Sequence, residues 1–161
     1  MARGYAQFVE IQVPPEIAWA AWTEEHWLRQ WYAPHVEIDP RSGGELRVRL
    51  RDGRVREAAI DVWMPNRRLR LIYFPEAEFT APGDPSAAGG GPVIEDILFD
   101  TKPGRSVVRV MGSGVPDARA WDRYYTRVRL GWAFHLHELK RLLEACFDPT
   151  GQERPATGTG R

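Results

Sequence analysis

Two acidic residues near the middle of the chain, Glu57 and Asp61, are the candidates for acid–base chemistry. A carboxylate that is buried against a ligand, a water pocket or a cation such as His135 has a shifted pKa and can transfer protons. No nucleophile or second acid accompanies the two carboxylates in the sequence, and no other residue is assigned a catalytic role. An enzyme that uses either carboxylate is therefore an alternative, and we expect a protein whose main activity is binding.

The orientation of these carboxylates depends on the turn before them. Asp52-Gly53 is typical of a two-residue hairpin, after which Val55–Met64 has the composition of a strand. Without a bulge, Leu50 pairs with the first residue of that strand, and both carboxylates point to the inner face of the sheet. A β-bulge would rotate the strand and bring Ile60 and Val62 inside instead. Both orientations stay open.

Aromatic residues indicate a second kind of chemistry, the binding of an apolar ligand. The chain has 7 Trp, 5 Tyr and 6 Phe, which is more aromatic mass than a core of this size needs. Such side chains line hydrophobic cavities as well as cores, so a packed interior is the alternative interpretation. The candidates for a cavity wall around a small apolar or aromatic ligand are Trp27, Trp31, Tyr73, Phe99, Tyr125, Val128, Trp132 and His135.

The histidines do not predict a metal site. His135 and His137 point to nearly opposite sides of a helix, and His26 and His35 share no ligand spacing with them. The sequence also lacks a phosphate loop, a dinucleotide fingerprint and a nucleophile elbow. We therefore predict neither a metal nor a cofactor.

The composition argues against nucleic-acid and membrane partners. The formal net charge is +0, and no apolar run is long enough to insert into a membrane. The hairpin register above would place Arg54 and Arg56 on the outer face opposite Arg47, Arg49 and Arg51, as a basic patch or as a solvated face neutralised by nearby acids. One cysteine and the absence of a signal-type start predict a cytoplasmic protein.

Hydrophobic periodicity predicts the elements that position these residues. A long helix over residues 117–146 carries an apolar stripe from Trp121 to Cys146, and Asp117 is its expected N-cap. Two short helices over residues 15–23 and 24–31 precede it, the second capped by Thr23. The expected strands cover residues 4–13, 45–51, 55–64, 69–74, 93–100 and 105–112.

Burying the helix stripe and the inner face of the strands together requires one arrangement. We predict an α+β helix-grip fold, in which a curved antiparallel sheet of six or seven strands wraps around the long C-terminal helix. Residues 1–147 should form one domain, with a flexible loop over residues 75–92 and a disordered tail over residues 148–161. Leu130 and Phe134, on the polar side of the long helix, either contact a second copy in a homodimer or are isolated surface residues.

Several stretches, taken in order, resemble the START-like or SRPBCC superfamily (helix-grip, birch-pollen-allergen-like), and within it the activator-of-heat-shock-protein-ATPase homologues. The matching stretches are PEIAWAAWT (residues 15–23), LRQWYAP (28–34), MPNRRL (64–69) and Gly131-Trp132 with Leu136, Leu139 and Leu143. They cover most of residues 5–147, and their order and spacing together carry the likeness. The loop over residues 75–92 departs from the tight connection usual in the family.

The resemblance implies an apolar cavity between the sheet and the long helix. Because members include lipid carriers, cyclases, hydrolases and chaperone regulators, the fold transfers to this chain and the activity does not. We therefore predict a bacterial-type protein that binds a small hydrophobic or lipid-like ligand. The alternatives are a chaperone-regulator-like interaction module and a cyclase- or hydrolase-like enzyme that uses Glu57 or Asp61.

Overall fold

The computed structural model describes residues 1–75 and 91–155. Most of the loop predicted over residues 75–92, and the last six residues of the predicted tail, lie outside these ranges. Residues 148–155 form a hydrogen-bonded turn, although disorder was predicted from residue 148. The Asp148 carboxylate accepts bonds from the Thr150 hydroxyl at 2.6 Å and from the Gln152 amide at 3.1 Å, and Gly151 takes a positive φ of 86°.

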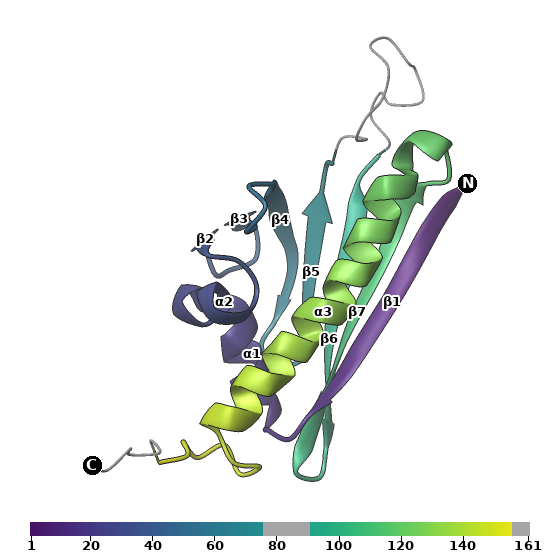
Figure 1. Cartoon of the computed structure of the whole chain (residues 1–161). Helices are drawn as coiled ribbons and strands as arrows, with labels where there is room; N and C mark the ends of the chain where they lie inside the picture. The colour runs from purple at the N-terminus through teal and green to yellow at the C-terminus, as the bar shows by residue number, and fades with distance from the viewer. Residues whose placement is uncertain (76–90, 156–161) are drawn as a thin grey trace.

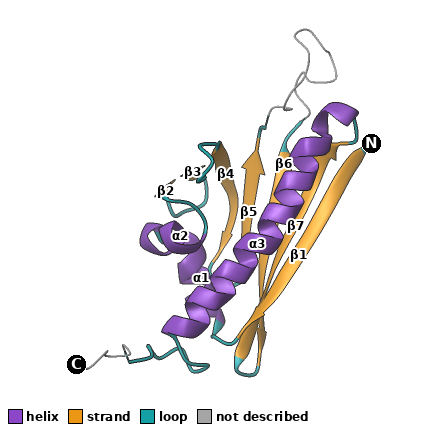
Figure 2. Cartoon of the chain, viewed as in Figure 1, coloured by secondary structure: helices purple, strands orange, loops and turns teal. Residues whose placement is uncertain are grey.

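Seven antiparallel strands form one sheet in the order β1-β7-β6-β5-β4-β3-β2 (Figures 1 and 2). Their bounds are β1 (Ala2–Ile11), β2 (His35–Ile38), β3 (Glu45–Arg49), β4 (Val55–Met64), β5 (Arg68–Tyr73), β6 (Val93–Lys102) and β7 (Arg105–Pro116). The short strand β2 was not predicted. It pairs with β3 and buries Val36, so that it extends the sheet beyond the hairpin.

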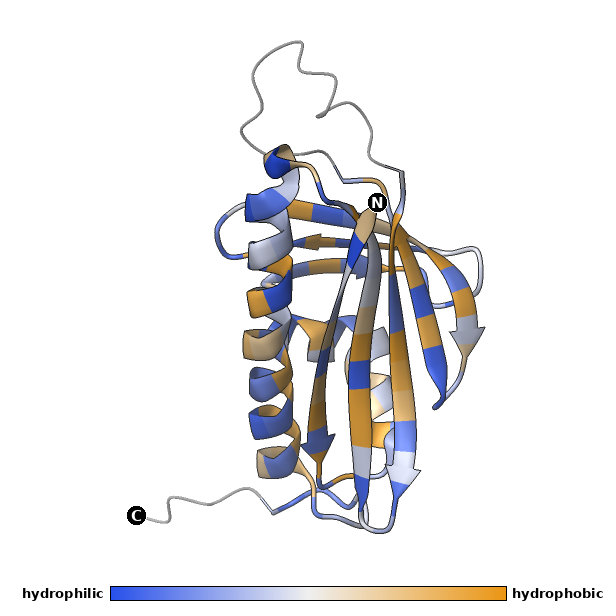
Figure 3. Cartoon of the chain, turned by 90° about the vertical axis from the view of Figure 1, so that its right-hand side faces the viewer, coloured by the Kyte–Doolittle hydropathy of each residue, from blue (hydrophilic) through white to orange (hydrophobic). Residues whose placement is uncertain are grey.

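All helices of the described chain lie on one face of this sheet (Figure 1). They are α1 (Pro15–Thr23), α2 (Glu25–Trp31) and α3 (Asp122–Cys146), with a 3₁₀ turn over Arg119–Trp121 before α3. Figure 3 shows the resulting two layers, α3 on one side and the sheet on the other. The α+β helix-grip prediction is therefore confirmed. None of the described helices is both long and apolar enough to cross a membrane.

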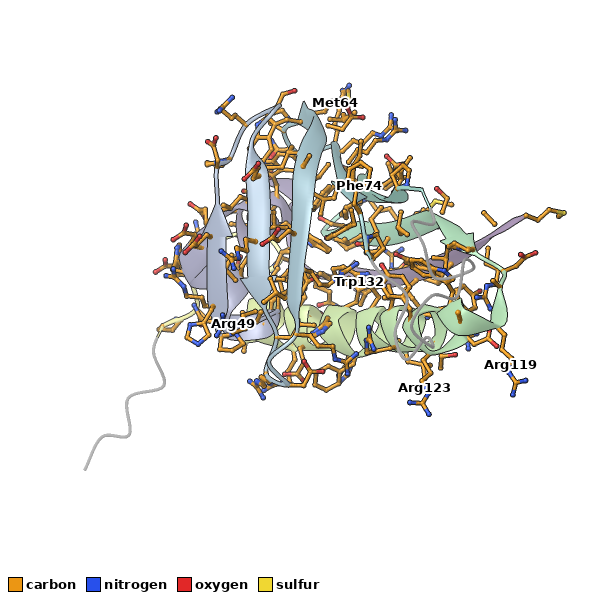
Figure 4. The ribbon with its side chains drawn as sticks, turned by 90° about the horizontal axis from the view of Figure 1, so that it is seen from above. Arg49, Met64, Phe74, Arg119, Arg123 and Trp132 are labelled. Carbon is orange, nitrogen blue, oxygen red and sulfur yellow. The ribbon has the colours of Figure 1, made fainter. Side chains whose placement is uncertain are left out.

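The long helix binds the sheet through the predicted stripe. Val128, Trp132, Leu136, Leu139 and Leu143 recur every three or four residues, and all are buried. In Figure 4, Trp132 points into the space between α3 and the sheet, whereas Arg119 and Arg123 project away from it.

Both predicted helix caps were wrong. The 3₁₀ turn begins the helical segment, so the residue before α3 is Trp121, which makes no side-chain cap, and the acid in the first turn is Asp122 rather than Asp117. The hydroxyl of Thr23 donates to the Trp19 carbonyl at 2.9 Å within α1, and Glu24 takes the position before α2. A threonine at a junction between helices can bond back to its own helix as readily as forward.

The β3–β4 hairpin has a different register from the one predicted without a bulge. The Leu50 amide donates to the Arg54 carbonyl at 2.8 Å, and Gly53 has a φ of 88°, so the loop contains three residues rather than two. Val48 consequently lies opposite Arg56, and a shift of one residue exchanges the two faces of β4.

This register turns Glu57 and Asp61 outward, so of the two orientations left open for β4 the one with an inward carboxylate is excluded. Ile60 is buried, as in the bulge alternative. A register irregularity follows it between Ile60 and Val62, after which Trp63 rather than Val62 points inward and packs edge-on against Trp19 at 4.9 Å.

Candidate functional site

A buried ion pair occupies the interior between the sheet and α3. Glu95 on β6 has no exposed surface, and its Oε1 accepts hydrogen bonds from the Tyr5 hydroxyl at 2.8 Å and from Trp132 Nε1 at 3.2 Å. Nη2 of Arg56, on β4, donates a third bond to the same oxygen. Glu95 is inward because it alternates with the buried apolar residues of β6. We call this pair and its ligating side chains the Arg56–Glu95 centre.

Tyrosine residues surround the guanidinium of Arg56. Its Nη1 donates to the Tyr32 hydroxyl at 2.8 Å, and its Cζ lies 4.2 Å from the centre of the Tyr73 ring. Burial opposes the charge of Arg56, but the carboxylate of Glu95 and the surrounding tyrosines together outweigh burial and raise the pKa of Arg56 well above its usual value. The arginine therefore stays charged inside the protein.

Three buried polar atoms of the centre have no hydrogen-bond partner within the described chain. They are Oε2 of Glu95 and the hydroxyl oxygens of Tyr73 and Tyr124, of which the first hydroxyl lies close to that of Tyr32 and the second close to the Arg56 guanidinium, without the geometry of a full hydrogen bond. Burial raises the pKa of both tyrosines, so each hydroxyl keeps its proton and remains a potential donor. An unpaired buried polar group costs about 1–3 kcal/mol, which a bound ligand or water could recover.

A cavity of about 530 Å³ lies beside this centre. Exposed residues such as Arg51 and Phe134 belong to its wall, so the cavity opens to solvent between the hairpin and α3. The wall residues come from α2 and the segment after it, the β3–β4 hairpin, the end of β5 and the middle of α3: Arg29, Gln30, Trp31, Tyr32, Ala33, Pro34, Leu50, Arg51, Asp52, Arg54, Val55, Arg56, Pro75, Tyr124, Arg127, Val128, Gly131, Trp132, Phe134, His135 and Glu138.

Comparison with known proteins places this architecture in a family. The family model described as "Activator of Hsp90 ATPase homolog 1-like protein" matches residues 12–144. The chain belongs to this family. It is a branch of the SRPBCC or START-like superfamily, so the resemblance inferred from the sequence is confirmed. No curated protein matches the chain.

Solved structures share the fold of this family member. A protein from Mesorhizobium loti is 22% identical with a TM-score of 0.72, and the match covers 88% of this chain and 97% of that one. The Aha1 dimer from Colwellia psychrerythraea is 18% identical with a TM-score of 0.71, covering 88% and 96%. CalU16 from Micromonospora echinospora is 17% identical with a TM-score of 0.63, covering 86% and 74%. At these identities the likeness shows the fold alone.

Four of the eight side chains predicted to bind a ligand lie in the cavity wall of this Aha1-like chain. Trp31 and Trp132 both pack on Trp22, with ring centres 4.9 and 5.3 Å away, and Val128 and His135 continue the wall along α3. Their role in binding a ligand stays a prediction.

The other four predicted residues lie outside the wall. Trp27 packs against Phe147, with ring centres 5.6 Å apart, and Phe99 fills the core beside Trp19 at 5.3 Å. The Tyr125 hydroxyl donates to the Gly4 carbonyl on β1. Tyr73 is buried beneath Arg56 and therefore belongs to the polar centre rather than to the wall.

His135 is the histidine of the cavity wall. Its ring stacks on Tyr32 with centres 5.1 Å apart, and its Nδ1 is buried without a partner in the described chain. Burial lowers the pKa of His135 from its usual value of 6.5, and the nearby charges of Arg56 and Arg51 add to this effect. The imidazole is therefore held neutral at the edge of the cavity at neutral pH.

The two carboxylates proposed for catalysis lie on the opposite face of the sheet. Glu57 pairs with Arg47 at 3.1 Å, and Asp61 lies 3.6 Å from Arg70, with all four side chains substantially exposed. No group of three or more His, Cys, Asp or Glu side chains in the described ranges is placed to hold a metal ion.

Sequence reasoning missed most of the polar centre. Glu95 could have been found, because Val93, Glu95, Ile97 and Phe99 alternate as the inward face of β6. Arg56 pointed outward in the register without a bulge, and because the choice between the two registers was open, its orientation was undecided. Tyr124 also lay outside the predicted helix stripe.

Proposed function

We propose that this chain binds a small, predominantly apolar ligand in the cavity between the β3–β4 hairpin and α3. The observation that carries the proposal is a cavity of about 530 Å³ with aromatic walls beside a set of unpaired buried polar atoms. Ligand sites typically have volumes of about 300–1,000 Å³ and combine apolar walls with a few polar groups. An aromatic ligand fits the rings of Trp31, Tyr32 and Trp132.

A cavity-filling substitution tests this proposal without removing any side chain from the wall. Gly131 lies in the wall on α3, and a Cβ added there meets no atom within 4 Å. Phe at position 131 would therefore extend a ring into the cavity, whereas Ala at the same position adds only a methyl group. N-phenyl-1-naphthylamine, a neutral fluorescent probe of apolar sites, reports whether the cavity remains available.

We expect the probe to bind the wild-type chain and Gly131→Ala with similar affinity, and to bind Gly131→Phe at least tenfold more weakly. A native mass spectrum of freshly purified protein should show an additional mass that is lost on denaturation. If Gly131→Phe binds the probe as tightly as Gly131→Ala, the probe lies elsewhere and the proposal fails.

A second candidate is an interaction module that acts through the surface. It is favoured by the family description, which refers to activators of the Hsp90 ATPase, and by the exposed apolar pair Leu130 and Phe134, which are 57% and 59% exposed. The Colwellia psychrerythraea neighbour is a dimer, which supports self-association, and this pair is the surface that we propose for it. Stimulation of ATP hydrolysis when the chain is added to Hsp90 would favour the regulator role, and unchanged hydrolysis would count against it.

An enzyme that uses an inward carboxylate is not proposed. Glu57 and Asp61 face solvent, and the carboxylate that does face inward, Glu95, is held by three hydrogen-bond donors on one oxygen. A base engaged in this way is poorly suited to accept a proton from a substrate. The proposed setting is the cytoplasm, which is consistent with a chain that has one cysteine, Cys146, and that cysteine unpaired.

A further inference from the structure

We propose that the ligand of this cavity is an aromatic compound with a neutral hydroxyl group, and that the Arg56–Glu95 centre binds that hydroxyl. The inference rests on the proposed function and specifies its ligand class. Arg56 links the centre to the cavity, because it lies in the cavity wall and 14% of its side chain is exposed, whereas Glu95 lies behind it, outside the wall. Tyr124 and Trp132 belong both to the centre and to the wall.

The unpaired atoms of the centre determine what kind of group they can bind. The Tyr73 and Tyr124 hydroxyls can donate, and Oε2 of Glu95 can only accept. A ligand hydroxyl accepts from a tyrosine and donates to a carboxylate, so it can satisfy both kinds of atom. A carbonyl could satisfy only the donors, and an ether would do the same.

Charge balance determines that the group is neutral. The positive charge of Arg56 is already matched by Glu95, and both side chains are withdrawn from water. An anionic head group would place a second negative charge beside Glu95 in a region of low dielectric constant, and a cationic one would face Arg56. A hydroxyl adds no net charge and therefore avoids both penalties.

Three probes that share one ring system separate these possibilities. Naphthalene is wholly apolar, 2-naphthol adds a hydroxyl that is neutral at pH 7, and 2-naphthoate adds an ionised carboxylate. Equilibrium dialysis of the full chain against each probe gives three dissociation constants. We expect 2-naphthol to bind about tenfold more tightly than naphthalene, which is the effect of one added hydrogen bond to buried groups, and 2-naphthoate to bind more weakly than 2-naphthol.

Two neighbouring tyrosines provide a matched pair of variants. Tyr124→Phe removes a buried hydroxyl that has no partner, so it should leave the melting temperature unchanged or raise it, and it should remove most of the preference for 2-naphthol over naphthalene. Tyr125→Phe removes a hydroxyl that donates to the Gly4 carbonyl outside the cavity, so it should keep the preference. Tyr73→Phe removes the second unpaired hydroxyl, which lies beneath Arg56 and outside the cavity wall, so it should reduce the preference less than Tyr124→Phe does.

The outcomes distinguish failure of this inference from failure of the proposed function. If none of the three probes binds, the proposed function itself fails. Naphthalene could bind as tightly as 2-naphthol, or the preference for 2-naphthol could survive in both Tyr124→Phe and Tyr73→Phe. Either result would show that the cavity binds ligands but that the centre does not bind their hydroxyl group. Tightest binding of 2-naphthoate would show that the arginines of the wall select an anion, and would overturn the inference.

Discussion

Removing the charge of Glu95 should destabilise the protein far more than removing the charge of an exposed glutamate. Glu95→Gln keeps the size of the side chain but leaves the guanidinium of Arg56 charged, buried and without a counter-charge. Breaking a buried pair in this way costs about 3–5 kcal/mol. For a chain of this length each kcal/mol lowers the melting temperature by about 2–4 °C, so we expect a decrease of roughly 6–20 °C.

Glu57 provides the control within the same sheet. It also pairs with an arginine, Arg47, at 3.1 Å, but its side chain is 65% exposed and that of Arg47 is 55% exposed. Exposed pairs contribute about 0–1 kcal/mol, so Glu57→Gln should lower the melting temperature by less than about 4 °C. The two substitutions are chemically identical, and the two sites differ in burial and in the additional hydrogen bonds that Tyr5 and Trp132 donate to Glu95.

The double variant Arg56→Met/Glu95→Gln tests whether the unpaired, buried charge of Arg56 causes the loss of stability in Glu95→Gln. Without the guanidinium no buried cation remains, so the double variant should be more stable than Glu95→Gln alone, even though two residues are changed. Calorimetry and urea unfolding of the wild-type chain, Arg56→Met, Glu95→Gln and the double variant measure this coupling. A loss of under 1 kcal/mol in Glu95→Gln, or a double variant that costs the sum of the two single changes, would show that the pair is effectively solvated and would refute the reasoning.

Further predictions concern protonation, packing and self-association. Burial lowers the pKa of His135, so below about pH 6.5 the unfolded chain binds a proton that the folded chain does not. The free energy of unfolding should therefore fall as the pH drops from about 7 to 5, and His135→Gln should reduce that slope. An identical slope in the variant would contradict this. Gly112→Ala should cost about 1–3 kcal/mol, because its Cβ would lie 2.0 Å from the ring of Tyr5. By contrast, Gly131→Ala should stabilise α3 by about 0.5–1 kcal/mol, and urea unfolding of both glycine variants tests the contrast in sign. Phe134→Lys should shift any dimer toward monomer in light scattering across a concentration series, and an unchanged mass would exclude this face as the interface.

The fold was predictable because its main signals repeat over many residues. The stripe of α3 extends from Val128 to Leu143, β3 alternates over its whole length and β6 alternates from Val93 to Phe99, so one irregular residue does not hide the pattern. The strand β2 was missed because it has only four residues, of which Val36 is the buried apolar one. A pattern of four residues with one buried apolar side chain occurs by chance in many loops, so it does not indicate a strand.

The polar centre was not predictable because it depends on a single turn. Asp52-Gly53 suits a two-residue hairpin and also a three-residue loop in which Gly53 has a positive φ. The two loops differ by one residue, and that difference decides whether Arg56 or Glu57 points inward. No local property of either side chain distinguishes the two registers, because the stabilising partner, Glu95, lies 39 residues away in the chain.

The position of β1 in the sheet has a consequence for how the chain folds. Among the elements that the structure describes, the strand Ala2–Ile11 comes earliest in the sequence, yet its partner in the described sheet is β7, and Glu10 pairs with Val107. The helix α3 packs across β1, where the Tyr125 hydroxyl donates a hydrogen bond to the Gly4 carbonyl and the Lys140 ammonium donates one to the Glu10 carbonyl. The first strand must therefore keep an unpaired edge until most of the chain has left the ribosome. Closure of contacts so distant in sequence should make the last step of folding slow, and it gives the nascent chain a period in which its first strand needs protection from other chains.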